Sequence, residues 1–147
     1  MRLFFIAILI PLLALAGCSS QEGLSGLFRC EGVVTFNSDP VAGAMITFHP
    51  SDGARGAGAI TDSAGRFRVT TLYPEDGIAP GTYRVTITRF EEYGPELPQV
   101  RNDEGEMIDQ ARPLRNILPA RYANPNTSDL SVTIEARRTT LNFDLVD

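Results

Sequence analysis

The sequence contains few cysteine and histidine side chains that could form a nucleophile–base pair. Its two cysteines are Cys18 and Cys30, and its one histidine is His49. A catalytic thiol needs a base or a lowered pKa, and His49 is the single imidazole available to Cys30. One cysteine and one histidine without a surrounding motif are a weak basis for such a pair. The sequence also lacks a Gly-rich phosphate loop, a serine elbow, and CxxC or HExxH spacing, so we expect a protein that is not an enzyme.

The carboxylates of one acidic segment, residues 91–117, are the second group with possible chemistry. The segment has seven acids against three arginines, and it contains three prolines. Calcium prefers oxygen ligands, and four acids lie close together in sequence: Asp103, Glu104, Glu106 and Asp109. Their spacing does not match that of an ordered calcium loop. We therefore predict no metal and no cofactor, with calcium at these four acids as the weaker alternative.

The same segment is unusually long for a connection inside a compact domain. Connections of this length are usually functional or disordered. One interpretation is a solvated acidic insertion loop outside the core. The other is a recognition loop that binds a partner, and its candidate residues are Glu91, Glu92, Tyr93, Arg101, Asp103 and Glu104.

The other cysteine ends an apolar N-terminal run. Residues 1–16 read MRLFFIAILIPLLALA, in which Arg2 is the only charge. A short positive start, an apolar stretch of this length and small residues before a cut indicate an export signal rather than a membrane span. The sequence Leu15-Ala16-Gly17-Cys18 resembles the lipobox of bacterial lipoproteins. That resemblance implies cleavage before Cys18 and attachment of diacylglycerol to its thiol; an ordinary secretory signal with a chance cysteine is the alternative.

These features divide the chain into three parts. Residues 1–17 are expected to be removed as a signal peptide, residues 18–27 to form a lipidated N-terminus and flexible tether, and residues 28–147 to form one domain. The net charge is −5 for the whole chain and becomes −6 when Arg2 is lost with the signal. This acidity argues against nucleic acid as a partner. We expect a protein of the bacterial cell envelope, held to the inner or the outer membrane by lipid.

Alternation of apolar and polar residues predicts the fold of the domain. Seven short segments alternate with a period of two and are separated by turn residues: 28–36, 44–49, 58–61, 66–70, 82–88, 130–135 and 140–146. This pattern is typical of an antiparallel β-sandwich of about seven strands, with a barrel as the alternative. In the predicted register Cys30 faces the core, and an inward Tyr83 near the start of its strand hydrogen bonds back to nearby backbone.

Four short motifs occur in a fixed order along the domain. They are G-x-V at residues 32–34, P-V-x-G-A at 40–44, T-D-x-x-G-x-F at 61–67 and P-G-x-Y-x-V at 80–85. In this order they resemble the transthyretin-like, carboxypeptidase-regulatory-like domain, and the ending LPARYANPNTSDL resembles small bacterial lipoproteins that carry one such domain. The resemblance implies the sandwich fold and says little about activity, because this fold serves many roles.

The leading functional hypothesis is a non-enzymatic, lipid-anchored module for adhesion or for binding a protein or glycan. The alternative is a structural or accessory subunit of a cell-envelope assembly without a small-molecule ligand, and an unrecognised hydrolase is a third possibility. Glycan binding usually needs exposed aromatic side chains. The chain has no tryptophan, and the tyrosines outside the predicted strands are Tyr73, Tyr93 and Tyr122, so a protein partner is favoured.

Overall fold

The computed structural model describes residues 26–147. The expected signal peptide, Cys18 and nearly all of the expected tether lie outside these residues. The described chain is all-β apart from one short 3-10 helix, η1. Its elements, in order, are β1 (Cys30–Phe36), β2 (Asp39–Pro40), β3 (Met45–Pro50), β4 (Ala57–Ile60), β5 (Arg66–Arg68), β6 (Gly81–Thr88), β7 (Phe90–Glu92), β8 (Val100–Arg101), β9 (Met107–Ile108), β10 (Leu114–Asn116), η1 (Ala120–Ala123), β11 (Ser131–Ile134) and β12 (Thr139–Leu145).

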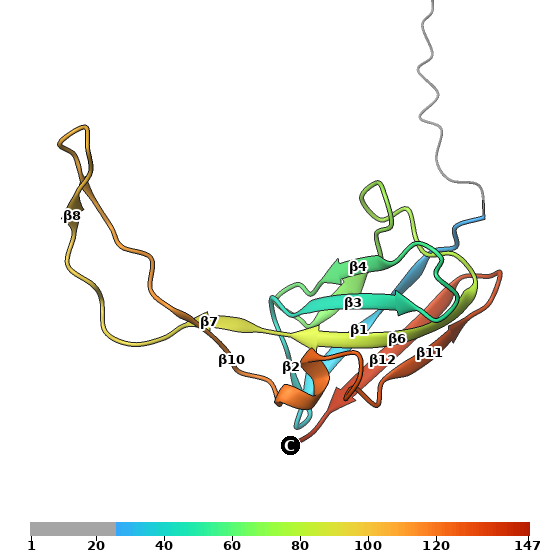
Figure 1. Cartoon of the computed structure of the whole chain (residues 1–147). Coiled ribbons are helices and arrows are strands. Elements are labelled where there is room, and N and C mark those ends of the chain that lie inside the picture. Colours follow the sequence, from blue (N-terminus) through green and yellow to red (C-terminus); the bar gives the residue numbers. More distant parts are fainter. Residues whose placement is uncertain (1–25) are drawn as a thin grey trace, which may run out of the picture.

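Two four-stranded sheets form the body of the protein (Figure 1). In the first sheet β1 is central: β12 pairs with one edge, and β5 and β2 pair with successive parts of the other. The second sheet has the order β11-β6-β3-β4. A bridge between Gly58 and Thr70 joins the two sheets along one side, with both backbone hydrogen bonds formed. The body is therefore sandwich-like, with its sheets connected at one edge.

The core lies between the two sheets and is built from the inward positions of the alternating strands. The ring of Phe48 on β3 packs against Phe143 on β12 of the other sheet, with centroids 6.5 Å apart. Phe143 in turn stacks on Phe67 of β5 at 5.9 Å. Tyr83 meets Phe48 edge to face, and its hydroxyl donates to the carbonyl of Ala79 at 2.9 Å. The predicted inward tyrosine and its backbone hydrogen bond are confirmed.

The sequence prediction of the strands needs two corrections. Each of the seven predicted segments overlaps a strand, but the described chain has twelve strands, because β2 and β7 to β10 add five short ones. The sandwich is also not wholly antiparallel, since β1 and β12 run parallel through seven paired positions from Cys30↔Thr139 to Phe36↔Leu145. Alternation reports which face of a strand is buried, and it contains no information about the direction of a distant partner.

The turn before β5 contains the T-D-x-x-G-x-F motif, and its residues stabilise the turn itself. The Asp62 carboxylate accepts hydrogen bonds from the backbone N–H groups of Ala64 and Arg66, both at 2.9 Å. Gly65 closes the turn with a φ of +72°, a conformation that favours glycine. The neighbouring Thr61 is buried, and its hydroxyl donates to Val41 and accepts from the N–H of Ala44. Thr61 thus connects the turn before β5 to the loop that follows β2, at the same end of the sandwich.

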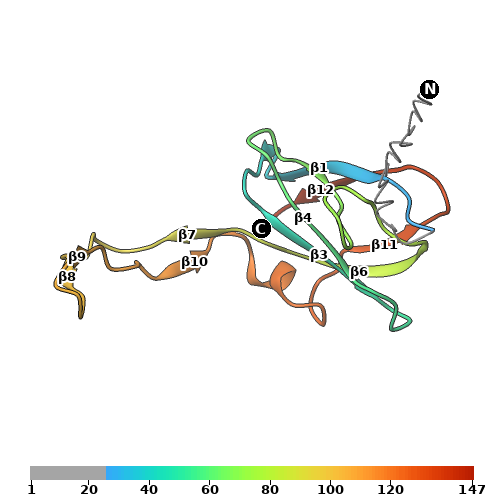
Figure 2. The same cartoon turned by 90° about the horizontal axis from the view of Figure 1, so that it is seen from above.

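Residues 90–116, here called the arm, leave the body as a long two-stranded hairpin (Figures 1 and 2). β7 pairs with β10 near the body, and β8 pairs with β9 near the tip. The sequence predicted an insertion loop at about 91–117 that lies outside the core. In the structure the segment has paired strands at both ends rather than the form of an irregular loop.

Candidate interaction site

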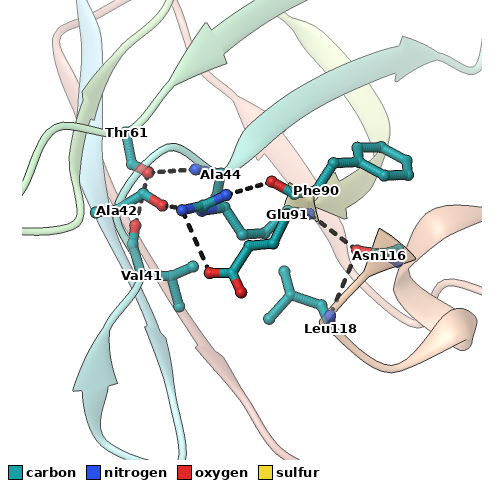
Figure 3. Close-up of polar contacts among 9 residues, drawn as sticks. Val41, Ala42, Ala44, Thr61, Phe90, Glu91, Asn116 and Leu118 are labelled. Atoms are coloured by element: carbon teal, nitrogen blue, oxygen red, sulfur yellow. Dashed lines mark hydrogen bonds and ion pairs between the residues drawn. The ribbon is translucent and has the colours of Figure 1, made fainter. Parts of the chain in front are cut away.

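The root of the arm is fixed by two polar side chains (Figure 3). The guanidinium of Arg89 donates to the carbonyls of Ala42 and Phe90 and lies 3.5 Å from the Glu91 carboxylate. On the other strand, the Asn116 side-chain oxygen accepts from the N–H groups of Arg89 at 2.9 Å and Leu118 at 3.3 Å. These contacts join both strands of the arm to the loop after β2, so they set the direction in which the arm leaves the body.

The base of the arm carries three of the residues proposed from the sequence. Glu91 and Glu92 lie in β7, and Tyr93 follows directly. Glu92 forms an ion pair with Arg112 of the opposite strand, and the guanidinium of Arg115 lies 4.8 Å from the centre of the Tyr93 ring. Cross-strand pairs of this kind stabilise a hairpin by a few tenths of a kcal/mol to about 1 kcal/mol each. These three residues are therefore engaged within the arm itself.

The middle of the arm has no regular ladder, because its prolines lack backbone N–H groups. Side chains connect the two strands here instead. The amide of Gln99 donates to the Asp109 carboxylate at 2.9 Å, and the amide of Gln110 donates to the carbonyl of Pro98 at 2.7 Å. The arm thus keeps its two strands together between the ladders at its base and its tip.

The tip of the arm is a tight turn between β8 and β9. The Asn102 side chain accepts from the N–H groups of Glu104 and Glu106, at 3.1 and 2.8 Å. Gly105 has a φ of +87°, and Arg101 donates to its carbonyl at 2.6 Å. An asparagine at the start and a glycine with positive φ at the end are typical of turns that close hairpins. The sequence therefore specifies a hairpin end at this position.

Apolar side chains along the arm are exposed to solvent. Val100 and Ile108 are directly opposite each other in the β8–β9 register, so they lie on one face of the ribbon. They are 39% and 44% exposed, although a cross-strand apolar pair normally packs against a core. Together, seven large side chains of the arm are exposed: Phe90, Tyr93, Leu97, Val100, Met107, Ile108 and Leu114. They keep between 39% and 64% of their surface in solvent.

The four acids considered for calcium are not brought together as a cation site. Within residues 26–147 no group of three or more histidine, cysteine, aspartate or glutamate side chains converges in a way that could hold a metal ion. Asp109 lies beyond β9, where its carboxylate accepts the hydrogen bond from Gln99. Asp103, Glu104 and Glu106 have no ion pair within that same part of the chain. They remain as free negative charges around the tip.

Cys30 and His49 do not form a catalytic pair in this fold. Cys30 is a free, buried thiol at the start of the central strand of the first sheet, and it faces the core as the alternation predicted. His49 belongs to the second sheet, where its Nε2 lies 3.0 Å from the hydroxyl of Thr86. Burial, and then the neighbouring charge of Glu31, raise the pKa of the Cys30 thiol to about 11. A thiol with a raised pKa is a poor nucleophile at neutral pH.

Labelling of Cys30 by a thiol reagent is expected to be slow in the folded chain. In a Cys18→Ser variant at pH 8 the native rate should be on the order of 100-fold below the rate in denaturant, because reaction needs local opening. Mass spectrometry over time measures both rates. The same measurement on an added surface cysteine, Asp144→Cys, gives the rate of an exposed thiol. Equal rates for Cys30 in the two states would show that its side chain faces solvent.

A shallow hollow lies on the outer face of the first sheet. It has a volume of about 570 Å³ and is lined in part by Glu31, Val33, Ile60 and Arg68. Several of its charges are paired: Arg68 contacts Glu75 at 2.9 Å, and Glu31 receives a hydrogen bond from Arg138. That hydrogen bond, with the charges of Arg138 and Arg68, lowers the pKa of Glu31. These pairs engage three of the charged side chains of the lining, Glu31, Arg68 and Glu75.

The arm, rather than the hollow or the thiol, is the best candidate site. The six residues proposed from the sequence all lie on it, but in two separate groups, with Glu91, Glu92 and Tyr93 at the base and Arg101, Asp103 and Glu104 at the tip. The sequence reasoning missed the exposed pair Val100 and Ile108. The signal that could have found it is the segment VRNDEGEMI, in which a turn sequence separates two short apolar segments.

Comparison with known proteins identifies no family. No family model matches the chain, and no curated protein does. Among solved structures, a 9R-lipoxygenase from Cyanothece PCC8801 is similar at 11% identity, with a TM-score of 0.33. The match covers 84% of this chain and 18% of the lipoxygenase, so the chain spans less than a fifth of that protein. Similarity at this level carries no argument about function. Within residues 26–147 there is also no helix of the length and apolar character needed to cross a membrane.

Proposed function

We propose that this chain is an exported bacterial lipoprotein whose β-sandwich presents the arm to a protein partner in the cell envelope. Catalysis is not part of this proposal. The observation that carries it is the arm itself, a two-stranded hairpin with seven exposed large apolar side chains and no core of its own. Isolated two-stranded hairpins are at best marginally stable in water. A partner that covers the apolar side chains would supply the missing burial.

The direction of the arm supports presentation away from the point of attachment. The chain enters the body at Phe28, which is bridged to Ile78 close to the start of β6. β6 then runs the length of the body, and the arm continues from its far end (Figure 1). A lipid on Cys18 would hold the entry end at the membrane. The tip would then point away from the bilayer, up to about 40 Å beyond the body, since an extended chain advances about 3.3 Å per residue.

The proposed fold family is the transthyretin-like, carboxypeptidase-regulatory-like domain. Its support comes from the four sequence motifs and from the local structure at those motifs. The turn at Asp62 and Gly65 and the inward Tyr83 both have clear structural roles in the described chain. A module of this kind is suited to hold an interaction element at one end, because loops at sandwich ends tolerate insertion.

Replacement of residues 91–115 by a short Gly-Ser linker is expected to abolish recovery of the partner. Recovery would be measured after crosslinking in intact membranes, followed by purification of the chain and mass spectrometry. The body should stay folded, since loop-closure entropy changes by only about 0.6 kcal/mol per doubling of length. The thermal unfolding midpoint is therefore expected to shift by no more than a few degrees.

A matched control is a second exposed connection, residues 51–56, replaced by the same kind of linker. This variant should recover the partner as the unchanged chain does. Equal recovery by the arm variant would contradict the proposal. A large fall in its unfolding midpoint would also contradict it, because the arm would then be a structural part of the sandwich.

A further inference from the structure

The face of the tip that carries Val100 and Ile108 lacks an apolar cover. The pair sits on two-residue strands, and the hydrogen bonds of such short strands give little stability by themselves. Proline-containing segments separate this ladder from the β7–β10 ladder at the base of the arm. Packing at the base therefore does not bury Val100 and Ile108. A surface that covers Val100 and Ile108 would stabilise the strand pairing and the turn together.

The charge of the arm restricts what that surface can be. The arm has seven acids and three arginines, a net charge of −4, whereas the rest of the described chain has a net charge of −1. Two of the arginines are engaged at the base, Arg112 with Glu92 and Arg115 with Tyr93. The third, Arg101, donates to the carbonyl of Gly105. That bond leaves the positive charge of Arg101 in place, but this arginine makes no ion pair within the described residues, and the tip keeps an excess of negative charge from Asp103, Glu104 and Glu106.

These charges exclude several occupants on physical grounds. Two arms packed against each other would bring two charges of −4 together, and the body of a second copy is itself slightly acidic. Anionic lipid and nucleic acid are repelled for the same reason. Complementary charge improves both the rate and the specificity of association. A surface with positive charge around an apolar centre fits both features of the tip.

We propose that the tip, residues 99–109, inserts into a groove of a different protein whose floor is apolar and whose rims carry lysine or arginine. Val100 and Ile108 contact the floor. Asp103, Glu104 and Glu106 pair with the rims. This inference rests on the proposed function, since it names the chemistry of the partner that the arm binds.

The test places a photoreactive group at the tip. Met107 is 52% exposed on the face of the ribbon opposite Val100 and Ile108, so a label there reaches a protein that surrounds the tip without replacing a contact residue, and a Met107→Cys change leaves the charge of the tip unaltered. Because Cys30 is buried, a benzophenone maleimide should label the new thiol selectively. Met45, also 52% exposed but on the body, gives the matched control Met45→Cys. Both full-length, labelled chains are irradiated in membranes of the source cell.

The expected result is one protein adduct with the Met107→Cys probe and none with Met45→Cys. The adduct should fall by about tenfold or more with Val100→Ser and Ile108→Ser together, because buried apolar contacts at the centre of an interface dominate its affinity. Replacement of Asp103, Glu104 and Glu106 by their amides, or high salt, should weaken it as well. The crosslinked partner peptide should lie in an apolar groove flanked by basic residues.

Several outcomes would overturn the inference. An adduct between two copies of this chain, an adduct with lipid or glycan, or no adduct at all would each do so. An adduct that persists in the Val100→Ser, Ile108→Ser variant, or one that is insensitive to both charge removal and salt, would also reject it. If such an outcome is found while replacement of the arm still abolishes partner recovery, the proposed function stands and only the chemistry assigned to the partner is wrong.

Discussion

Replacement of Gly32 by alanine is expected to destabilise the sandwich by more than about 3 kcal/mol, in the range of changes that have a clear structural cause. Gly32 lies in β1, where it pairs with Leu141 of β12 and with Phe67 of β5. A Cβ at this position would be 1.9 Å from the Leu141 carbonyl oxygen and 2.8 Å from the tip of the Phe67 ring. The backbone of a neighbouring strand would have to move, and the Phe67–Phe143 stack would move with it.

Thermal unfolding followed by circular dichroism measures this effect. For a domain of this size a loss of 3 kcal/mol corresponds to a fall of about 10 °C in the midpoint. Gly58→Ala is the matched control, because Gly58 also lies in a strand and its added Cβ would meet the Ile46 carbonyl oxygen at an ordinary 3.4 Å. A similar midpoint for Gly32→Ala and the unchanged chain would show that β1, β5 and β12 are not packed as described.

Replacement of Cys18 by serine is expected to move the protein completely from the membrane fraction to the soluble fraction, or to leave an uncleaved precursor. A serine hydroxyl cannot form the thioether to diacylglycerol that the proposed lipobox implies. Each buried methylene contributes about 0.8 kcal/mol, so loss of the acyl chains removes nearly all membrane affinity. Sedimentation of membranes after cell lysis, with detection of the chain in each fraction, measures the change.

Intact-mass analysis of the mature chain gives the direct test of the same site. The expected mass is that of residues 18–147 with lipid attached to Cys18. Ser19→Ala, a change at the adjacent position, should leave both the mass increment and the membrane association in place. An unmodified Cys18, or an N-terminus at another residue, would contradict lipid anchoring and would remove the basis for the membrane-distal position of the arm.

The strands of the body could be predicted because burial of one face leaves a strong pattern. Apolar residues alternate with polar ones both around β5 and in β6. The apolar residues of this pattern are all buried: Phe67, Val69, Tyr83, Val85 and Ile87. The partner of β12 could not be predicted in this way. Its apolar residues Phe143 and Leu145 show which face is inward, but the parallel pairing with β1 depends on how the whole chain returns across the sandwich.

The arm was predicted only as a charged, proline-containing segment. A ribbon with both faces in solvent has no buried side to impose alternation, so the periodic signal that identified β6 is absent there. The acids and Tyr93 were recognisable as candidate contacts from residue type alone. Val100 and Ile108 become notable only through their cross-strand register and their exposure, which are properties of the folded chain.

The pairing of the first and last long strands also governs when this protein can fold. β1 is the first strand of the described chain and ends at Phe36, and the whole of one edge is occupied by β12, which begins only at Thr139. Contacts between such distant segments form slowly, because a long loop must close before they are gained. One edge of β1 therefore stays unpaired until the distant segment Thr139–Leu145 reaches it. We expect the first sheet to form late and as one unit, because its central strand lacks one neighbour until then.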